Sequence, residues 1–247
     1  MLRVIFLIFL IPISFTSIGD SELINNYHEN GQKSIEGTYK DNKRDGKWIE
    51  WNKDGLITSE SNYKNGKLDS RHTFAYHKNG QIMFSRNYLG DKENGKWTEW
   101  NQDGVIIIES NYKNGALESR HTYHPNGKTK SKRTFSNGND DGIELNWNNK
   151  GQIIHEAYFE LGYQSKNSSY EYYQSGQMKS QSHMKQDRIR AEWLEHGADG
   201  TWRRDGHWIQ MSEDGTKTAE GFFTLGSGKW TEWNQDGVII IESNYKN

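Results

Sequence analysis

Histidines are the first residues in this 247-residue chain whose type and spacing could support chemistry. There are nine, and two pairs, His72 with His77 and His121 with His124, stand at equivalent places in the sequence. A zinc site needs three or four converging ligands that are oriented by a second shell of hydrogen bonds. Each pair offers only two ligands, so we expect partly exposed strand histidines and predict neither a metal site nor another cofactor.

A second candidate is the segment 137–142, Asn-Gly-Asn-Asp-Asp-Gly, which resembles the start of a calcium-binding loop. The twelfth position of such a loop carries a bidentate Glu, whereas this chain has Asn148 there. Asn137-Gly138 also aligns with turns elsewhere in the chain. We therefore expect a turn with one or two inserted residues.

Carboxylates form the third candidate, because glutamates recur at regular spacing. Glycoside hydrolysis by paired carboxylates requires one carboxyl group with a raised pKa beside a cleft. A flat sheet provides no such cleft, so we expect a solvated face and predict no catalytic residue. The recurring glutamates are Glu36, Glu60, Glu109, Glu156, Glu220 and Glu242.

The glutamates recur with the same period as a sequence repeat that runs through most of the chain. Residues 228–247 are identical to residues 95–114. A turn glycine recurs every 23 to 25 residues from Gly31 to Gly176, and the frame resumes at Gly215 and Gly237. An aromatic residue usually stands four positions before this glycine, and another stands eight positions after it. Such repetition is typical of an array that binds a partner or acts as a spacer.

Each repeat shows the pattern of a β-hairpin. After Gly104 the pattern predicts a strand with Ile106, Ile108, Ser110 and Tyr112 on one face and the residues between them on the other. Asn-Gly and Asp-Gly pairs provide the positive φ angles of hairpin turns. We predict an all-β fold: an elongated single-sheet antiparallel meander of repeated β-hairpins with a repeat of about 24 residues. Alternation places the glutamates on the face opposite the aromatic side chains.

Composition narrows the class of protein. The apolar mass lies mainly in 10 Trp, 13 Tyr and 9 Phe, whose rings can cover one face of a sheet. A net charge of −2 gives no electrostatic footprint for nucleic acid, so no nucleic-acid partner is expected. The absence of cysteine excludes disulfides, thiolate metal sites and a catalytic thiol.

The N-terminal segment 1–19 does not belong to the repeats. Arg3 precedes an apolar run, and small residues follow at Ser17 and Gly19. This order is typical of a signal peptide, here cleaved before Asp20. We expect an exported protein (periplasmic, cell-surface or secreted) with a repeat array over 20–247; the alternative is an uncleaved N-terminal anchor.

The repeat frame is broken by an irregular unit at about 185–213. This unit is either a specific contact site or a decayed repeat. Aromatic and arginine side chains are the usual anchors of protein interfaces. The candidate partner-binding residues are Trp97, Trp100, Arg188, Arg190, Trp193, Trp202, Arg203 and Arg204.

The pattern Gly-Lys-Trp-x-Glu-Trp-x-x-Asp-Gly-x(7)-Tyr-Lys-Asn-Gly, at 46–66, 95–115 and, without its last glycine, 228–247, resembles the bacterial variant of the MORN repeat. That resemblance implies hairpins stacked into one long sheet and a protein-interaction role. Many bacterial members are assigned as YwqK-type antitoxins, and eukaryotic relatives are associated with membranes and scaffolding. The resemblance implies no catalytic residue. Cell-wall choline- and glucan-binding repeats share Gly-Lys-Trp but match less well.

Together these features predict a non-catalytic protein-binding repeat protein, and the resemblance implies that it is the antitoxin or immunity component of a toxin–antitoxin pair. The alternative is an exported membrane- or cell-wall-associated scaffold, with peripheral membrane contact, or a carbohydrate-binding repeat protein. The apolar segment 238–245 would form an edge strand. Such an edge is a template for self-association with a second copy, and fraying of the terminal hairpin is the alternative.

Overall fold

The computed structural model describes residues 21–187 and 201–246, and every regular element in these ranges is a β-strand. Nineteen strands in the described ranges form one antiparallel sheet, which confirms the predicted all-β fold of repeated hairpins. By its contacts the chain divides into a first part, Met1–Arg71, and a second part, His72–Asn247.

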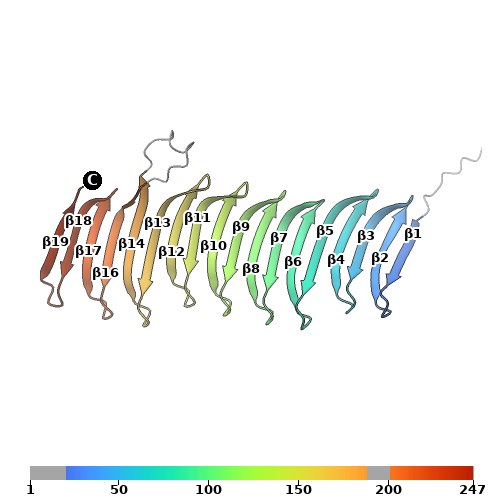
Figure 1. The fold of residues 1–247 in the computed structure, drawn as a ribbon, viewed down its shortest axis with the longest axis horizontal. Coiled ribbons are helices and arrows are strands. Elements are labelled where there is room, and N and C mark those ends of the chain that lie inside the picture. Colours follow the sequence, from blue (N-terminus) through green and yellow to red (C-terminus); the bar gives the residue numbers. More distant parts are fainter. Residues whose placement is uncertain (1–20, 188–200, 247) are drawn as a thin grey trace, which may run out of the picture. The chain divides into compact units, whose positions relative to one another are not determined.

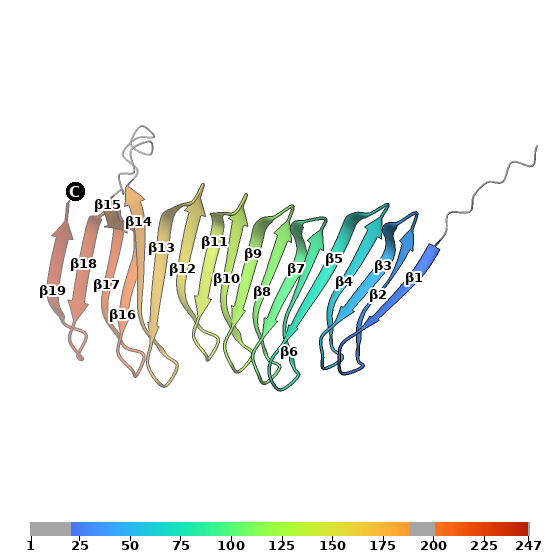
Figure 2. The same cartoon turned by 45° about the vertical axis from the view of Figure 1, so that its right-hand side comes forward.

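The strands follow one another in chain order within each part (Figures 1 and 2). The first part contains β1 (Ser21–Tyr27), β2 (Lys33–Lys40), β3 (Lys43–Trp51), β4 (Ile57–Lys64) and the start of β5 (Lys67–Tyr76). The second part contains β6 (Ile82–Leu89), β7 (Lys92–Trp100), β8 (Ile106–Lys113), β9 (Ala116–Tyr123), β10 (Thr129–Ser136), β11 (Asn139–Trp147), β12 (Ile153–Glu160), β13 (Tyr163–Tyr172), β14 (Met178–Asp187), β15 (Thr201–Arg204), β16 (Gly206–Met211), β17 (Lys217–Thr224), β18 (Ser227–Trp233) and β19 (Ile239–Tyr245).

The first turn of each repeat is a five-residue loop. A side chain within the loop forms hydrogen bonds with the backbone of the same loop. Between β3 and β4, the Asn52 N–H donates to the Leu56 carbonyl at 2.9 Å. The Asn52 Oδ1 accepts from the N–H groups of Asp54 and Leu56 at 3.0 and 2.9 Å. Only Gly55 adopts a positive φ, 79°. This conformation explains why the glycine sets the frame of the repeat.

The second turn is tighter and needs two residues in the left-handed region. Between β4 and β5, Asn65 and Gly66 have φ values of 52° and 80°. Two consecutive positive φ angles are the requirement of a type I′ hairpin turn, for which Asn-Gly is the favoured pair. This turn also bonds to β3, because the Gly66 N–H donates to the Arg44 carbonyl at 2.8 Å.

A bulge follows each first turn and changes which side chains share a face. Glu99 pairs with Ile108 and Trp100 with Ile106, so Ile107 has no directly opposed partner in β7. From the alternation in the sequence, Ile106 and Ile108 are predicted to lie on one face of the sheet. That interpretation is wrong for Ile106, because the extra residue of a bulge interrupts the alternation.

The irregular unit is an insertion between two paired strands. In β14, Met184 to Asp187 pair with β15, while Ser180 and Gln181 pair with β16. β15 and β16 meet at Asp205, whose N–H donates to the His183 carbonyl at 3.0 Å. The repeated hairpins therefore continue on both sides of residues 188–200, which lie outside the described residues.

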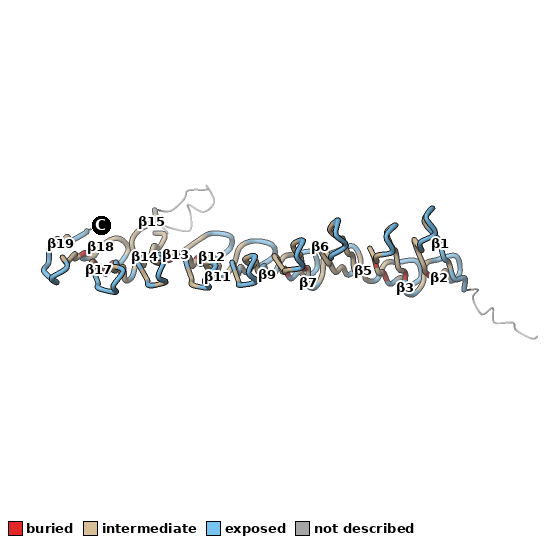
Figure 3. Tube along the Cα trace, turned by 90° about the horizontal axis from the view of Figure 1, so that it is seen from below, coloured by how far each residue is buried: buried red, intermediate tan, exposed pale blue. Residues whose placement is uncertain are grey.

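Few side chains are fully buried, as Figure 3 shows by the scarcity of red in the trace. In the described part of the chain the buried apolar residues are Trp48, Ala157, Ala219, Phe223 and Trp230. Three of them, Ala219, Phe223 and Trp230, form a cluster with Trp208 packed against it. A one-layer sheet cannot enclose its rings, so most aromatic side chains remain accessible on one side.

Candidate interaction surface

One face of the sheet, here called the aromatic face, carries a tryptophan between two tyrosines in two alternate repeats. In the first part, the ring centroid of Trp48 lies 5.1 Å from that of Tyr39 and 6.3 Å from that of Tyr63. In the second part, Trp97 lies 5.8 Å from Tyr88 and 4.4 Å from Tyr112. Edge and tilted contacts of this kind are the favoured arrangements of aromatic pairs.

Arginine side chains lie over these rings. The Arg44 guanidinium is 4.2 Å from the Trp48 ring centroid and donates to the Tyr63 hydroxyl at 3.1 Å. Arg86 is 4.6 Å from the Trp97 ring centroid and 4.1 Å from that of Phe84. Cation–π contacts at these distances fix the position of the guanidinium, and Arg86 also donates to Glu99 at 3.5 Å. Two further arginines repeat the arrangement: Arg133 over Phe135 and Phe159, and Arg204 over Trp208, Phe223 and Tyr245.

Small residues make room for the tryptophans. A Cβ atom added to Gly37 would lie 2.1 Å from the Trp48 ring, and one added to Gly221 would lie 2.7 Å from the Trp230 ring. Both glycines follow a turn glycine by six residues. The same position holds Ser110, which pairs directly with Trp97 and is only 4% exposed. Sequence analysis missed this position, although its recurrent small side chain was a visible signal.

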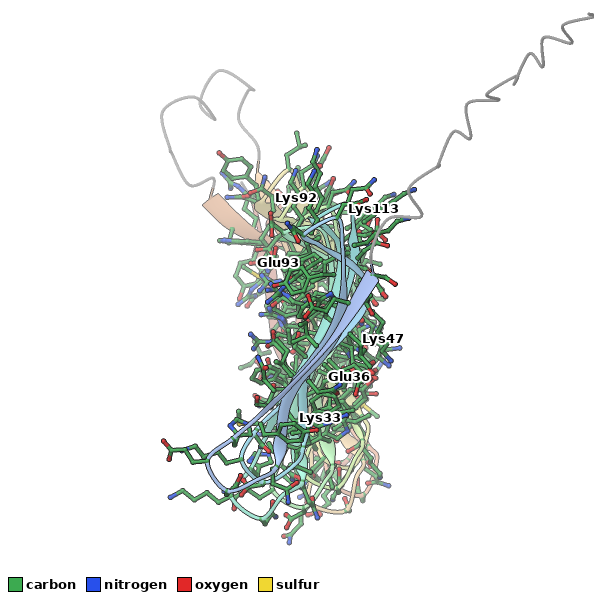
Figure 4. The ribbon with its side chains drawn as sticks, turned by 90° about the vertical axis from the view of Figure 1, so that its right-hand side faces the viewer. Lys33, Glu36, Lys47, Lys92, Glu93 and Lys113 are labelled. Atoms are coloured by element: carbon green, nitrogen blue, oxygen red, sulfur yellow. The ribbon has the colours of Figure 1, made fainter. Side chains whose placement is uncertain are left out.

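The opposite face, here called the glutamate face, carries ion pairs in place of free carboxylates. Lys47 pairs with Glu60 at 2.8 Å in the first part, and Lys96 pairs with Glu109 in the second. Lys33 likewise lies beside Glu36, with which it forms an ion pair (Figure 4). The lysine of Gly-Lys-Trp therefore neutralises a glutamate on the next strand.

Glu109 is bonded by two side chains. Lys96 and the Tyr123 hydroxyl both bond to it, with Tyr123 at 2.7 Å, and together they lower the pKa of Glu109 below its ordinary value. Burial and the bond to Glu109 raise the pKa of Tyr123 to about 12. Both shifts favour a structural contact between an ionised carboxylate and a neutral phenol.

The second tryptophan of each Gly-Lys-Trp-x-Glu-Trp motif lies on the glutamate face. Lys33 is 5.5 Å from the Trp51 ring centroid while paired with Glu36, and Lys217 is 5.1 Å from the Trp233 ring centroid while paired with Glu220. The expectation that the glutamates lie opposite all the aromatic residues is therefore wrong.

The candidate partner-binding residues are divided between the two faces. Trp97 lies on the aromatic face; Trp100, three residues later in the same strand, lies on the other. Arg204 is on the aromatic face with Trp202, which precedes it by two residues and is half-buried, whereas Arg203 points to the opposite face. Three other candidates, Arg188, Arg190 and Trp193, lie outside the described residues.

The histidines join neighbouring repeats through the backbone. The Nε2–H groups of His77 and His124 donate to the carbonyls of Trp100 and Trp147 at 2.9 Å. His72 contacts the Ser85 hydroxyl through Nε2 at 2.6 Å. The segment proposed as a calcium-like loop begins with Asn137-Gly138, which forms the turn between β10 and β11.

The described residues contain neither a metal-binding cluster nor a membrane-spanning helix. No group of three or more His, Cys, Asp or Glu side chains is placed there to hold a metal ion. No helix within residues 21–187 and 201–246 is long and apolar enough to cross a membrane.

Comparison with protein families identifies the repeats. Six segments match the MORN repeat variant: residues 25–41, 44–65, 93–114, 122–137, 168–186 and 227–247. The chain belongs to the MORN repeat variant family. The MORN match at 44–65 covers the hairpin of β3 and β4, and the match at 93–114 covers that of β7 and β8. One MORN repeat therefore corresponds to two paired strands and the first turn that joins them.

No curated protein matches the sequence. A crystal structure of TcdB2–TccC3–Cdc42 is 10% identical over 89% of this chain and 15% of that chain, with a TM-score of 0.27. A Photorhabdus luminescens Tc holotoxin pore is 10% identical over 90% of this chain and 15% of that chain, with a TM-score of 0.26. A Bacteroides fragilis protein of unknown function is 11% identical over 76% of this chain and 89% of that chain, with a TM-score of 0.14. Similarity at this level says nothing about the function of the MORN protein.

Proposed function

We propose that this MORN repeat protein is a non-catalytic binding protein whose aromatic face receives a protein partner. The observation that supports it most strongly is the recurrent Arg–aromatic cluster, in which Arg86 lies over Trp97 and Arg44 over Trp48. Trp, Tyr and Arg are the residue types enriched at the energetic centres of protein interfaces.

The clusters suit binding because their side chains are already fixed. Ring contacts and guanidinium contacts restrict Arg86, Trp97 and Tyr112 before any partner arrives. Ordering a flexible side chain at an interface costs about 0.5–1.5 kcal/mol, and a preordered surface avoids much of that cost. Several such clusters along the chain add contact area without new conformational change.

The absence of catalysis is part of the proposal. An enzyme needs distinct groups that converge on one place, whereas the reactive side chains here recur once in each repeat. Glu60 and Glu109 are engaged by lysines, and His77 and His124 by backbone carbonyls. These groups hold the sheet together in the proposed role.

The finer proposal is that the partner is the toxin of a toxin–antitoxin pair, which would be inactivated by occlusion. Membership of the MORN repeat variant family supports this. The N-terminal segment 1–19 supports export, so the toxin would act outside the cytoplasm. Growth rescue on co-expression with a candidate toxin tests the pairing, and a reporter fused after residue 19 tests the export.

The general proposal is tested with a partner recovered from native cells and then produced separately. Its affinity for the wild-type chain is measured by calorimetry and compared with that for Arg86→Gln and for the control Lys113→Gln, which removes an exposed charge elsewhere. We expect Arg86→Gln to weaken binding about tenfold or more and the control to have no effect. Equal affinities, or recovery of a glycan in place of a protein, would contradict the proposal.

A further inference from the structure

Two arginines of the aromatic face occupy the same place in repeats that are far apart in the sequence. Arg44 and Arg204 each begin an Arg-Asp-Gly-x-Trp segment, which ends at Trp48 or at Trp208. In both segments the guanidinium lies over the tryptophan, 4.2 Å from the Trp48 ring centroid and 5.0 Å from that of Trp208. We call Arg44 and Arg204 the Arg-Asp-Gly arginines.

Further contacts hold both guanidinium groups in place. Arg44 donates to the Tyr63 hydroxyl at 3.1 Å, and its guanidinium lies 5.2 Å from the Tyr63 ring centroid. The Arg204 guanidinium lies 5.2 Å from the ring centroid of Phe223 and 4.9 Å from that of Tyr245. Both arginine side chains are half-buried. Their positions are therefore fixed by neutral groups.

Neither of the Arg-Asp-Gly arginines forms an ion pair in the described part of the chain. The carboxylate that follows each of them is bonded to the backbone of a turn. Asp45 Oδ1 accepts from the Asn65 N–H at 3.1 Å, and Asp205 Oδ1 accepts from the Leu225 N–H at 3.2 Å. Partial burial of a charge is costly, and an opposite charge beside it offsets that cost. The described fold does not supply that opposite charge to either guanidinium.

Another repeat completes the arginine–carboxylate pair within the chain. Asp140 occupies the position of Arg44, because it also precedes an Asp-Gly pair and lies opposite the residue eight positions after a turn glycine. Arg133, six positions after that glycine, places its Nε 2.8 Å from Asp140 Oδ1. In the repeats of the Arg-Asp-Gly arginines the position of Arg133 holds an uncharged residue, Gly37 or Ser182. These two repeats therefore keep the cation and lack the carboxylate.

We propose that Arg44 and Arg204 each bind a carboxylate of an acidic segment in the protein partner. A planar guanidinium binds a carboxylate through two parallel hydrogen bonds, which select the direction of the ligand as well as its charge. The rings of Tyr63 and Tyr245 beside the two arginines are only partly covered, so each acidic residue should have an apolar neighbour. The inference rests on the proposed function, because it takes a protein as ligand of the same face.

The test follows the arginine Nε–H signals of the full chain by NMR during titration with a synthetic peptide, Leu-Glu-Leu-Glu-Leu, blocked at both ends. We expect the signals of Arg44 and Arg204 to shift saturably, with an affinity that falls as salt is added. The Arg133 signal is the internal control and should not move, because its carboxylate is already in place. Equal shifts of all three signals, or no shift of any, would overturn the proposal.

Variants test the two sites one at a time. In Arg44→Gln the Arg204 signal should still shift, which also shows that the variant is folded, and the reverse should hold for Arg204→Gln. The double variant should bind a fluorescein-labelled form of the peptide about tenfold more weakly than the parent chain, as the loss of charge-assisted hydrogen bonds implies. The control Lys113→Gln removes an exposed charge and should leave the affinity unchanged. An unchanged affinity of the double variant would contradict the proposal.

Two further titrations identify the source of the negative charge. A peptide with glutamines in place of the glutamates should leave the Arg44 and Arg204 signals unmoved. Inorganic phosphate should move them only at higher concentrations than the peptide does, because it makes no contact with the neighbouring rings. Shifts at a lower concentration of phosphate would overturn the proposal in favour of a small-anion site.

The outcomes separate this inference from the proposed function. If the Arg44 and Arg204 signals stay fixed while Arg86→Gln still weakens binding of the isolated partner, the partner sits on the aromatic face and only the carboxylate inference fails. If the peptide moves both signals while Arg86→Gln leaves partner affinity unchanged, the carboxylate sites are supported and the proposed function fails.

Discussion

Arg86 and Trp97 occupy directly opposed positions on β6 and β7, with the guanidinium 4.6 Å from the ring centroid of the tryptophan. Arg86 stands six residues after a turn glycine, where other repeats hold Gly37 or Ser110. Trp97 therefore lies between Arg86 on β6 and the small residue Ser110 on β8.

The contact between Arg86 and Trp97 predicts a measurable loss of stability on truncation. Arg86→Ala removes the cation–π contact and the ion pair with Glu99 at 3.5 Å, and should cost about 1 kcal/mol in the free energy of unfolding. Arg86→Lys keeps the charge and should cost less. Urea melts of the two variants provide the comparison, and a larger loss for lysine would contradict the role given to the planar guanidinium.

The two tryptophans of one motif should contribute differently to the free energy of unfolding. Trp48 is 2% exposed and packs between two tyrosines, so Trp48→Ala should cost about 3–5 kcal/mol. Trp51 is half-buried under Lys33, and Trp51→Ala should cost about 1–2 kcal/mol. Similar losses in denaturant melts would mean that the two faces are not distinguished as described.

A strained turn offers a stabilising substitution. Leu161 has a φ of 52° and is 81% exposed, in the turn position where other repeats have Asn65 or Asn114. A leucine in the left-handed region is strained, and asparagine tolerates that region well. Leu161→Asn should therefore stabilise the protein by about 0.5–1 kcal/mol. The matched control is Leu89→Asn at the end of β6, where the same gain would show that the effect is not conformational.

The bond between Tyr123 and Glu109 predicts a pH dependence of stability. Because the folded state lowers the pKa of Glu109, its stabilising contribution is present above the unfolded pKa and is lost as pH falls through the folded value. Glu109→Gln should therefore be less stable than the wild type at neutral pH, and the difference should shrink in acid. The pKa of Tyr123 is raised to about 12, and this shift produces the opposite pH dependence of stability. Its contribution is present below pH 10 and lost as pH rises toward 12, and Tyr123→Phe should remove that alkaline loss.

Much of the fold could be predicted because the repeat encodes it locally. Asn65-Gly66 can satisfy two positive φ angles at low cost, and the alternation after Gly104 is that of a strand. The resemblance to the MORN repeat variant rested on the same residues. The faces were predicted less well, because a bulge at Ile107 interrupts alternation and leaves no mark in the pattern of apolar residues.

The contacts of the surface could not be predicted in the same way. Arg86 and Trp97 are eleven residues apart in the chain, and their contact depends on a register set by the turn and bulge between β6 and β7. A single sequence shows the residue types but does not show which residues lie directly opposite one another on neighbouring strands.

The most direct test of the central claim, that the partner sits on the aromatic face, is site-specific photocrosslinking. Benzoylphenylalanine is placed at Tyr88 or Tyr112 on the aromatic face, and at Asn87 or Asn111, the adjacent residues on the same strands. Neighbouring residues of a strand point to opposite faces, so each pair differs in face and little else. We predict that one partner protein crosslinks in native cells from Tyr88 and Tyr112 and not from Asn87 and Asn111. Equal crosslinking from both faces, or crosslinking from the two asparagine positions alone, would contradict the account.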